Sequence, residues 1–177
     1  MPALAVLLLA ACSGEAQHKV EYAVPDALCG VRIENEDIAP FVPPGNKLTK
    51  TGDALVNGEY ASGCDYAVDN KKTLLVSNFF HSDAPTARDI AEKRATAYGD
   101  GDTKVTVDAS GDVALYSRGA VAVEACPGYP SDAGGLPRKS FSVEILTYYP
   151  KDLSKTEKAL TQLVKQLLPA VKKANGC

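Results

Sequence analysis

Residues 113–126, VALYSRGAVAVEAC, give the clearest indication of the architecture, because large apolar residues recur at every second position on both sides of a turn at Gly119. A period of two residues is typical of β-strands that bury one face. The same period appears before this stretch at residues 105–107 and after it at residues 141–145. The connections are too short to contain crossover helices, so four mostly antiparallel strands are predicted here.

A β-hairpin is predicted ahead of these four strands. Cys64, Tyr66 and Val68 alternate with more polar neighbours, and the largely apolar segment 73–80 follows them. The polar run DNKK at residues 69–72 separates the two segments, as is typical of a turn between paired strands. The hairpin brings the expected total to six strands.

Two main helices are predicted, one on each side of the four-strand region in the sequence. Ser82 or Asp83 would cap the first helix, which runs to about Tyr98. The second helix begins near Ser154 and Glu157, which have the spacing of a capping box. Apolar residues then recur at the helical period, at Leu160, Leu163, Val164, Leu167, Leu168 and Val171.

Together these elements predict a single α+β domain. The simplest arrangement is a two-layer sandwich, in which two main helices cover a mostly antiparallel sheet of about six strands. Short helices are also expected at residues 25–29 and 35–39. The segment 45–63 carries four glycines and little periodicity, which predicts a long loop. A chain of 177 residues suits one such domain with a tether.

The charges of the chain argue against one class of partner. Its 19 basic and 22 acidic side chains give a formal net charge of -3, and both signs are mixed along the sequence. No basic patch is therefore expected for phosphates, and nucleic acid is not an expected partner. The two histidines are His18 and His81, so a mechanism that needs a histidine base has few candidates.

The N-terminus carries an apolar run at residues 3–11 that is followed at once by Cys12. A helix needs about 20 apolar residues to span a bilayer, so this run is too short for a transmembrane anchor. Its length suits the apolar core of a signal peptide. The sequence LAAC at residues 9–12 resembles the lipobox of bacterial lipoproteins, in which the cysteine receives a lipid and cleavage occurs just before it.

This resemblance implies how the chain is divided and where it is located. Residues 1–11 would be a signal peptide, although they lack the Lys or Arg that normally opens one, as a signal peptide truncated at its start would. Residues 12–24 would be the lipidated Cys12 and a tether, and residues 25–177 one disulfide-stapled domain. The expected location is the extracytoplasmic face of the cell membrane, with the membrane as a partner through the lipid on Cys12.

The four remaining cysteines are Cys29, Cys64, Cys126 and Cys177. An even number in an exported chain predicts two disulfides, for which three pairings are possible. Pairing Cys29 with Cys64 and Cys126 with Cys177 is preferred because it gives two separate local staples. A zinc site is not expected, since no C-x-x-C pair is present and no histidine lies near any of these cysteines.

Four side chains at the ends of predicted strands are candidate binding residues. Phe80 and His81 end the hairpin, and Tyr148 and Tyr149 follow the last strand. Strand alternation turns one aromatic side chain of each pair away from the core, where it could line a binding patch. No G-x-S-x-G or comparable catalytic motif is present, no metal ion or cofactor is expected, and a noncatalytic role is favoured.

The order of cysteines and strands carries a second resemblance. Cys29 lies in an early short element, Cys64-Asp65-Tyr66 opens a hairpin, and Val121 to Cys126 forms a late strand. This order resembles small uncharacterised lipoproteins of actinobacteria over residues 26–177, and the resemblance implies a fold without an assigned activity. The expected function is a noncatalytic envelope module that binds a small apolar ligand or an envelope protein, and the alternative is an envelope hydrolase that uses His81.

Overall fold

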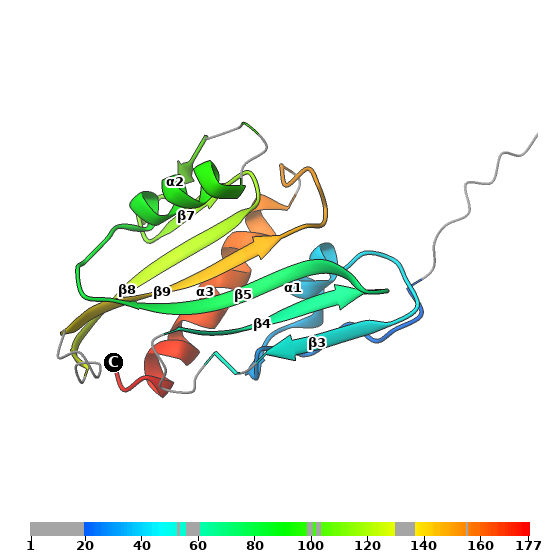
Figure 1. Cartoon of the computed structure of the whole chain (residues 1–177), viewed down its shortest axis with the longest axis horizontal. Helices are drawn as coiled ribbons and strands as arrows, with labels where there is room; N and C mark the ends of the chain where they lie inside the picture. Colours follow the sequence, from blue (N-terminus) through cyan, green and yellow to red (C-terminus); the bar gives the residue numbers. More distant parts are fainter. Residues whose placement is uncertain are drawn as a thin grey trace, which may run out of the picture.

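The chain folds around a seven-stranded antiparallel sheet (Figure 1). The computed structural model describes residues 20–52, 54–55, 61–98, 101, 104–129, 137–154 and 156–177. The strand order across the sheet is β3-β4-β5-β9-β8-β7-β6. The strands are β3 (Leu48–Gly52), β4 (Ala61–Val68), β5 (Lys71–His81), β6 (Thr106–Val107), β7 (Val113–Tyr116), β8 (Gly119–Tyr129) and β9 (Arg138–Thr147). The predicted α+β class with a mostly antiparallel sheet is confirmed.

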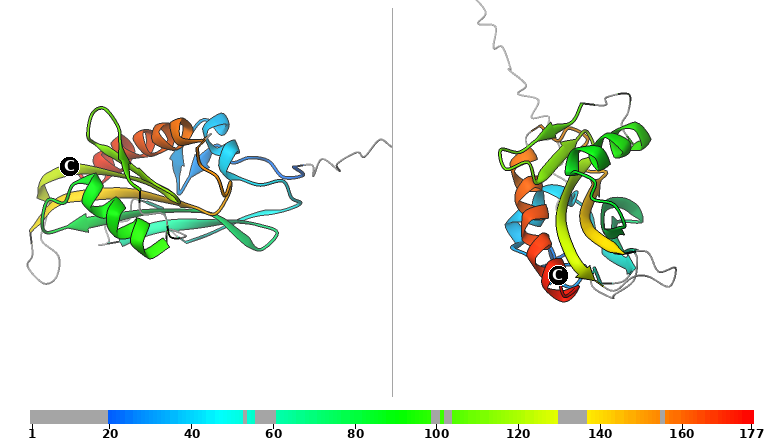
Figure 2. Two further views of the ribbon diagram at one scale, coloured as in Figure 1. Left: turned by 90° about the horizontal axis from the view of Figure 1, so that it is seen from above. Right: turned by 90° about the vertical axis from the view of Figure 1, so that its left-hand side faces the viewer.

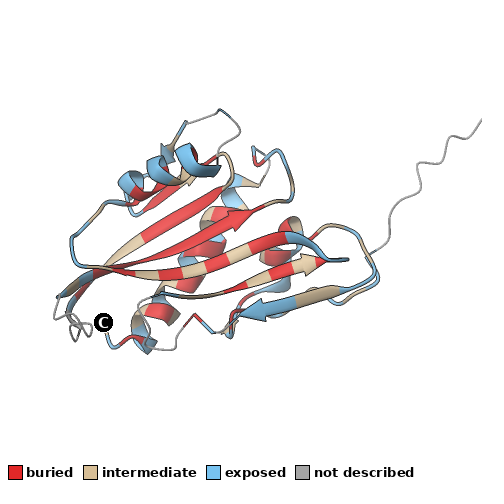
Figure 3. Cartoon of the chain, in the orientation of Figure 1, coloured by how far each residue is buried: buried red, intermediate tan, exposed pale blue. Residues whose placement is uncertain are grey.

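Within the seven-stranded sheet, β3 is the strand that the sequence does not predict. It lies inside the segment 45–63, so the prediction of an unbroken loop there is wrong for residues 48–52. Its sequence, LTKTG, shows no apolar alternation because the strand is at the edge of the sheet, where its second half is exposed (Figure 3). Pairing with β4 holds it in place, from Leu48 opposite Val68 to Gly52 opposite Cys64. Residues 56–60 lie outside the described residues.

The two main helices lie on opposite faces of the sheet (Figure 2). Helix α2 (Ala87–Tyr98) packs on the face that presents Val121 and Leu146, whereas α3 (Glu157–Ala174) packs on the face that presents Val143. Strands β7 and β8 are apolar at both odd and even positions, and β9 is buried on both faces from Ser140 to Thr147, so both faces of these strands need a cover. This half of the sheet is therefore covered on both sides, while the predicted sandwich has both helices on one side.

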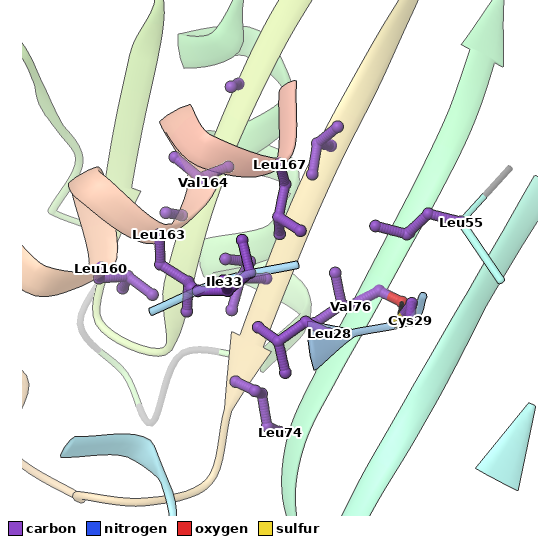
Figure 4. Packing of buried hydrophobic residues seen from close by; sticks show 14 of the residues in the cluster. Leu28, Cys29, Ile33, Leu55, Leu74, Val76, Leu160, Leu163, Val164 and Leu167 are labelled. Atoms are coloured by element: carbon purple, nitrogen blue, oxygen red, sulfur yellow. Dashed lines mark hydrogen bonds between the residues drawn. The ribbon is translucent and has the colours of Figure 1, made fainter. Parts of the chain in front are cut away.

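The main core lies between the sheet and α3 (Figure 4). The predicted apolar stripe of α3 is confirmed, because Leu160, Leu163, Val164, Leu167 and Val171 are fully buried. Burial of one such side chain contributes roughly 1.5–3 kcal/mol relative to exposure. Beyond α3 the core is closed by α1 (Asn35–Ile38) and the 3-10 turn η1 (Ala39–Phe41), which confirm the short helix predicted there.

Residues 27–32 form a two-stranded β-ribbon, where a helix is predicted over residues 25–29. Strand β1 (Ala27–Leu28) pairs with β2 (Val31–Arg32) around a two-residue turn at Cys29 and Gly30. Both turn residues have positive φ angles, 48° and 87°, as a type I′ turn requires. Glycine adopts this conformation at little cost. Gly30 therefore allows a hairpin turn here, and the prediction of a short helix over residues 25–29 is wrong.

Helix α2 begins later than its predicted cap. The Thr86 hydroxyl accepts a hydrogen bond from the Asp89 N–H (3.1 Å), and the Asp89 carboxylate accepts one from the Thr86 N–H (2.8 Å). This reciprocal pair satisfies two backbone donors at the start of the helix. Thr86 is therefore the cap, in place of Ser82 or Asp83.

Two disulfides join the elements, and the preferred pairing is confirmed. Cys29 bonds to Cys64 across a Cα–Cα distance of 5.5 Å, and Cys126 bonds to Cys177 across 4.8 Å. The first disulfide attaches the β1–β2 ribbon to β4, next to the Tyr66 hydroxyl, which accepts a hydrogen bond from the Cys29 N–H (3.1 Å). The second attaches the end of α3 to strand β8.

The first described residues already contact the domain. Val20 forms a bridge with Gly45, and the Glu21 N–H donates to the Gly45 carbonyl (2.9 Å). Tyr22 and Val24 pack against the main core. Residues 20–24, which are expected to be tether, therefore belong to the folded domain. Residues 1–19, with the predicted signal peptide and Cys12, lie outside the described residues. Within the described residues, no helix is long and apolar enough to cross a membrane.

An ion pair ties the β6–β7 turn to α3. The Lys165 ammonium lies 2.6 Å from the Asp108 carboxylate, which also accepts hydrogen bonds from the Ser110 hydroxyl (2.8 Å) and the Val113 N–H (3.1 Å). Burial by itself raises the pKa of Asp108, but the bonds from Lys165, Ser110 and Val113 outweigh it and lower that pKa to about 2. The ionised carboxylate therefore stabilises the folded state.

Replacing Asp108 by asparagine is expected to lower the free energy of unfolding by about 1 kcal/mol at pH 7. Because the folded-state pKa lies below the ordinary value of 3.8, this stabilisation is full above pH 3.8 and disappears as the pH falls through about 2. Urea unfolding of both proteins between pH 7 and pH 2 measures the difference. Asp112→Asn, at an exposed position of the same turn, is the control. Equal losses in the two variants would contradict the prediction.

Candidate functional site

The predicted binding residue Phe80 lies in the core. Its side chain is fully buried on the α3 side of the sheet, with its ring centroid 6.3 Å from that of Phe141. Strand alternation instead places Phe79 on the α2 side, where it is half-buried beneath the Arg94 guanidinium. The expectation that Phe80 lines a binding patch is therefore corrected, and the aromatic side chain that faces outward is Phe79.

The two predicted pairs lie at opposite ends of the sheet. In the register of β5 with β9, His81 pairs with Ser140, whereas Leu74 pairs with Thr147, just before Tyr148. Seven residues of extended strand separate these positions, or roughly 23 Å. Tyr148 is half-buried below the Arg118 guanidinium, and the next residue, Tyr149, is 37% exposed. The four predicted residues therefore form no common site.

His81 belongs to a chain of polar contacts on the α2 side. Its Nε2 lies 2.9 Å from the Ser142 hydroxyl, which donates a hydrogen bond to the Glu144 carboxylate (3.1 Å). The Arg94 guanidinium pairs with the same carboxylate at 2.6 Å. Burial lowers the pKa of His81, although Glu144 opposes this effect, so the ring is mostly neutral at pH 7.

The direction of these hydrogen bonds matters for catalysis. Because the Ser142 proton points to Glu144, the Nε2 of His81 must be the donor in its bond to Ser142. A serine hydrolase needs the reverse arrangement, in which the histidine accepts the proton of the serine hydroxyl. Ser142 is also fully buried. This geometry gives the hydrolase alternative little support.

A small cavity of about 70 Å³ lies beside α2. Arg94 and Glu144 line it together with the rings of Phe79, Tyr98 and Tyr116. Its two charged groups already pair with each other, and sites for small molecules are usually 300 Å³ or larger. We therefore assign this cavity a structural role, in which the ion pair attaches α2 to the sheet.

A larger hollow of about 300 Å³ lies on the other side of the sheet, between strands β6 and β7, the segment 151–154 and the start of α3. We call it the α3 hollow. Leu115, Leu153 and Leu160 give it an apolar wall, of which Leu153 and Leu160 are buried. The volume is in the range that small ligands occupy.

Charged and hydroxyl groups surround the apolar wall of the α3 hollow. Lys151 and Glu157 line it with exposed side chains, and neither has a hydrogen bond or ion pair among the described residues. The hydroxyl side chains of Thr106 and Ser154 line it as well. Unlike the cavity beside α2, the α3 hollow presents opposite charges that are available to a ligand.

The local structure explains why the α3 hollow is open. The predicted capping box is absent, because the helix begins at Glu157 after Thr156, which makes no side-chain cap. The Thr156 hydroxyl instead donates to the Leu153 carbonyl (3.1 Å), and the Ser154 N–H donates to the Asp152 carboxylate (2.9 Å). These local bonds fold the segment before α3 into a turn. The side chain of Ser154 is left to line the hollow.

Comparison with known proteins identifies no relative of this chain. No known family matches it, and no curated protein or solved structure matches it at a significant level. The resemblance to actinobacterial lipoproteins therefore stays a prediction. Among the residues that the structure describes, no group of three side chains suited to bind a metal ion is present.

Proposed function

We propose that this protein is a lipid-anchored module of the cell envelope, located outside the cytoplasm, that binds a small ligand in the α3 hollow. The observation that carries the binding proposal is a pair of opposite charges beside an apolar wall, on the side chains of Lys151 and Glu157, which have no partner within the part of the chain that the structure describes. Pockets for small molecules typically combine an apolar lining with a few convergent polar groups.

The anchor and the location rest on the cysteines. Cys12 follows an apolar run and small residues, as the modified cysteine of a lipoprotein does. The two disulfides agree with export, because disulfides persist in oxidising compartments and are rare in the cytosol. The α3 hollow lies on a domain that begins soon after Cys12 in the sequence, so binding would take place near the membrane surface.

Expression of the full chain in an exporting bacterium tests both halves of this proposal. The membrane-fraction protein is expected to have the intact mass of a chain that begins at Cys12, with added acyl groups and four protons lost to two disulfides. Native mass spectrometry of the same preparation, mixed with a panel of small polar metabolites, is expected to show a one-to-one complex. A Cys12→Ala variant is the control and should lose the acyl mass.

Two results would contradict the proposal. A membrane-fraction protein that retains Met1 and carries no lipid would remove the anchor. A protein that binds no metabolite of the panel would remove the ligand-binding function.

The hydrolase alternative depends on the contact between His81 and Ser142. A fluorophosphonate probe, which labels activated serines, distinguishes it from the proposed function. The buried Ser142 and the donor role of His81 argue that no labelling will occur. Labelling that disappears in a His81→Ala variant would favour the hydrolase instead.

A further inference from the structure

We propose that the ligand of the α3 hollow is a small zwitterion of the amino-acid type. Its carboxylate would face Lys151, its ammonium group would face Glu157, and its aliphatic side chain would lie on the wall formed by Leu115, Leu153 and Leu160. This inference rests on the proposed binding function and adds the chemical class of the ligand.

The balance of charge around the hollow favours a zwitterion over a simple ion. Two lysines, Lys104 and Lys151, and two acids, Asp152 and Glu157, line the same space. A simple anion would be attracted by the lysines but repelled by the acids. A simple cation would be attracted by the acids but repelled by the lysines. A ligand with both charges gains from both pairs at once.

Two of these four groups are the most available to a ligand. Asp152 already accepts a hydrogen bond from the Ser154 N–H, and Lys104 has an interaction of its own. The side chains of Lys151 and Glu157 have neither a hydrogen bond nor an ion pair among the described residues. A ligand that pairs with both of them therefore breaks no existing contact, which keeps the cost of binding low.

The leucine wall selects the rest of the ligand. Leu115 is only half-buried, so it supplies apolar surface that a ligand can cover, at about 25 cal/mol per Å² of apolar area removed from water, while the buried Leu153 and Leu160 lie behind it. A hollow of about 300 Å³ has room for an amino acid with an aliphatic side chain. The hydroxyl groups of Thr106 and Ser154 can bond to the remaining polar atoms of such a ligand.

Titration of the full chain with three probes tests the ligand class. L-leucine carries both charges, 4-methylpentanoate is the same molecule without the ammonium group, and leucinamide lacks the carboxylate. Calorimetry is expected to show at least tenfold weaker binding of either analogue than of L-leucine. Amide NMR shifts on adding L-leucine should be concentrated at residues 104–117 and 151–160.

Two charge-removing variants identify the contacts. Lys151→Gln is expected to weaken L-leucine binding at least tenfold and to reduce the penalty for leucinamide, and Glu157→Gln should do the same for 4-methylpentanoate. Lys139→Gln and Glu92→Gln remove one charge of each sign at exposed positions away from the hollow, and should leave binding unchanged. Thermal unfolding of every variant shows that a loss of binding is not a loss of folding.

The outcomes separate this inference from the proposed function. If an analogue binds as tightly as L-leucine, the zwitterion is overturned, while a ligand site in the α3 hollow remains. If L-leucine does not bind but other metabolites of the panel shift the same amides, the ligand class is overturned and the binding function stands. If no small molecule shifts these amides, both proposals fall.

Discussion

Replacing Phe80 by alanine is expected to lower the free energy of unfolding by about 3–5 kcal/mol. The Phe80 ring is fully buried in the core on the α3 side of the sheet. It lies beside the Phe141 ring, and its centroid is 4.7 Å from the central carbon of the Arg138 guanidinium. Truncation removes this buried area and leaves a cavity that a closely packed core fills only in part. Urea unfolding, followed by tyrosine fluorescence and circular dichroism, measures the change.

Phe79→Ala is the matched control, because the same residue type is removed from the next position of the same strand. Phe79 lies on the α2 side and is only half-buried, so its loss is expected to cost about 1 kcal/mol. Equal losses in the two variants would contradict the assignment of Phe80 to the core.

Replacing Cys126 and Cys177 together by alanine is expected to lower the free energy of unfolding by about 4 kcal/mol. The disulfide closes a loop with a sequence separation of 51, and its removal increases the conformational freedom of the unfolded chain. Because Cys177 lies three residues after the end of α3 at Ala174, amide exchange should also become faster in the last turn of that helix. Urea unfolding and hydrogen exchange measure the two effects.

The other disulfide provides the comparison. The Cys29→Ala/Cys64→Ala double variant lacks the disulfide that closes a loop with a sequence separation of 35. A similar loss of stability is expected from it. Its faster exchange should be found in the β1–β2 ribbon rather than in α3. If both double variants exchange faster in the same region, the two disulfides are not the separate local staples that the structure shows.

The regular elements of this fold could be predicted because each strand or helix has its own period of apolar residues in the sequence. Large aliphatic residues recur at every second position of VALYSRGAVAVEAC, at Val113, Leu115, Val121 and Val123, and the two runs pair as β7 and β8 through a short turn. The apolar stripe from Leu160 to Val171 repeats every three or four residues since α3 buries one face. Both patterns depend on neighbours in the chain, so the residues alone reveal them.

Elements that depend on distant partners could not be predicted in this way. The residues of β3, LTKTG, become a strand because β4 offers its edge to them. Cys29 and Gly30 form a turn because the ribbon is held against β4 by a disulfide and by Tyr66. The sequence also does not say that α2 and α3 cover opposite faces, since apolar residues at every position of a strand fit either arrangement.

The candidate site was even harder to predict from sequence than the fold, because its residues come together only through tertiary contacts. The predicted binding residues are two pairs of sequence neighbours, Phe80 with His81 and Tyr148 with Tyr149. The register of β5 with β9 places these two pairs at opposite ends of the paired strands. The α3 hollow joins residues from position 104 to position 160. Lys151 and Glu157 carry no motif, and they become candidates because their side chains have no partner among the residues that the structure describes.

The α+β class, most of the strands, the long amphipathic helix and the four cysteines that pair can be predicted from the residues alone, because these features follow from local periodicity and residue chemistry. The folded chain is needed to show which face each helix covers, where the edge strand lies and which charged side chains have no partner among the described residues. These properties arise from contacts between segments far apart in the chain, and no local pattern records them.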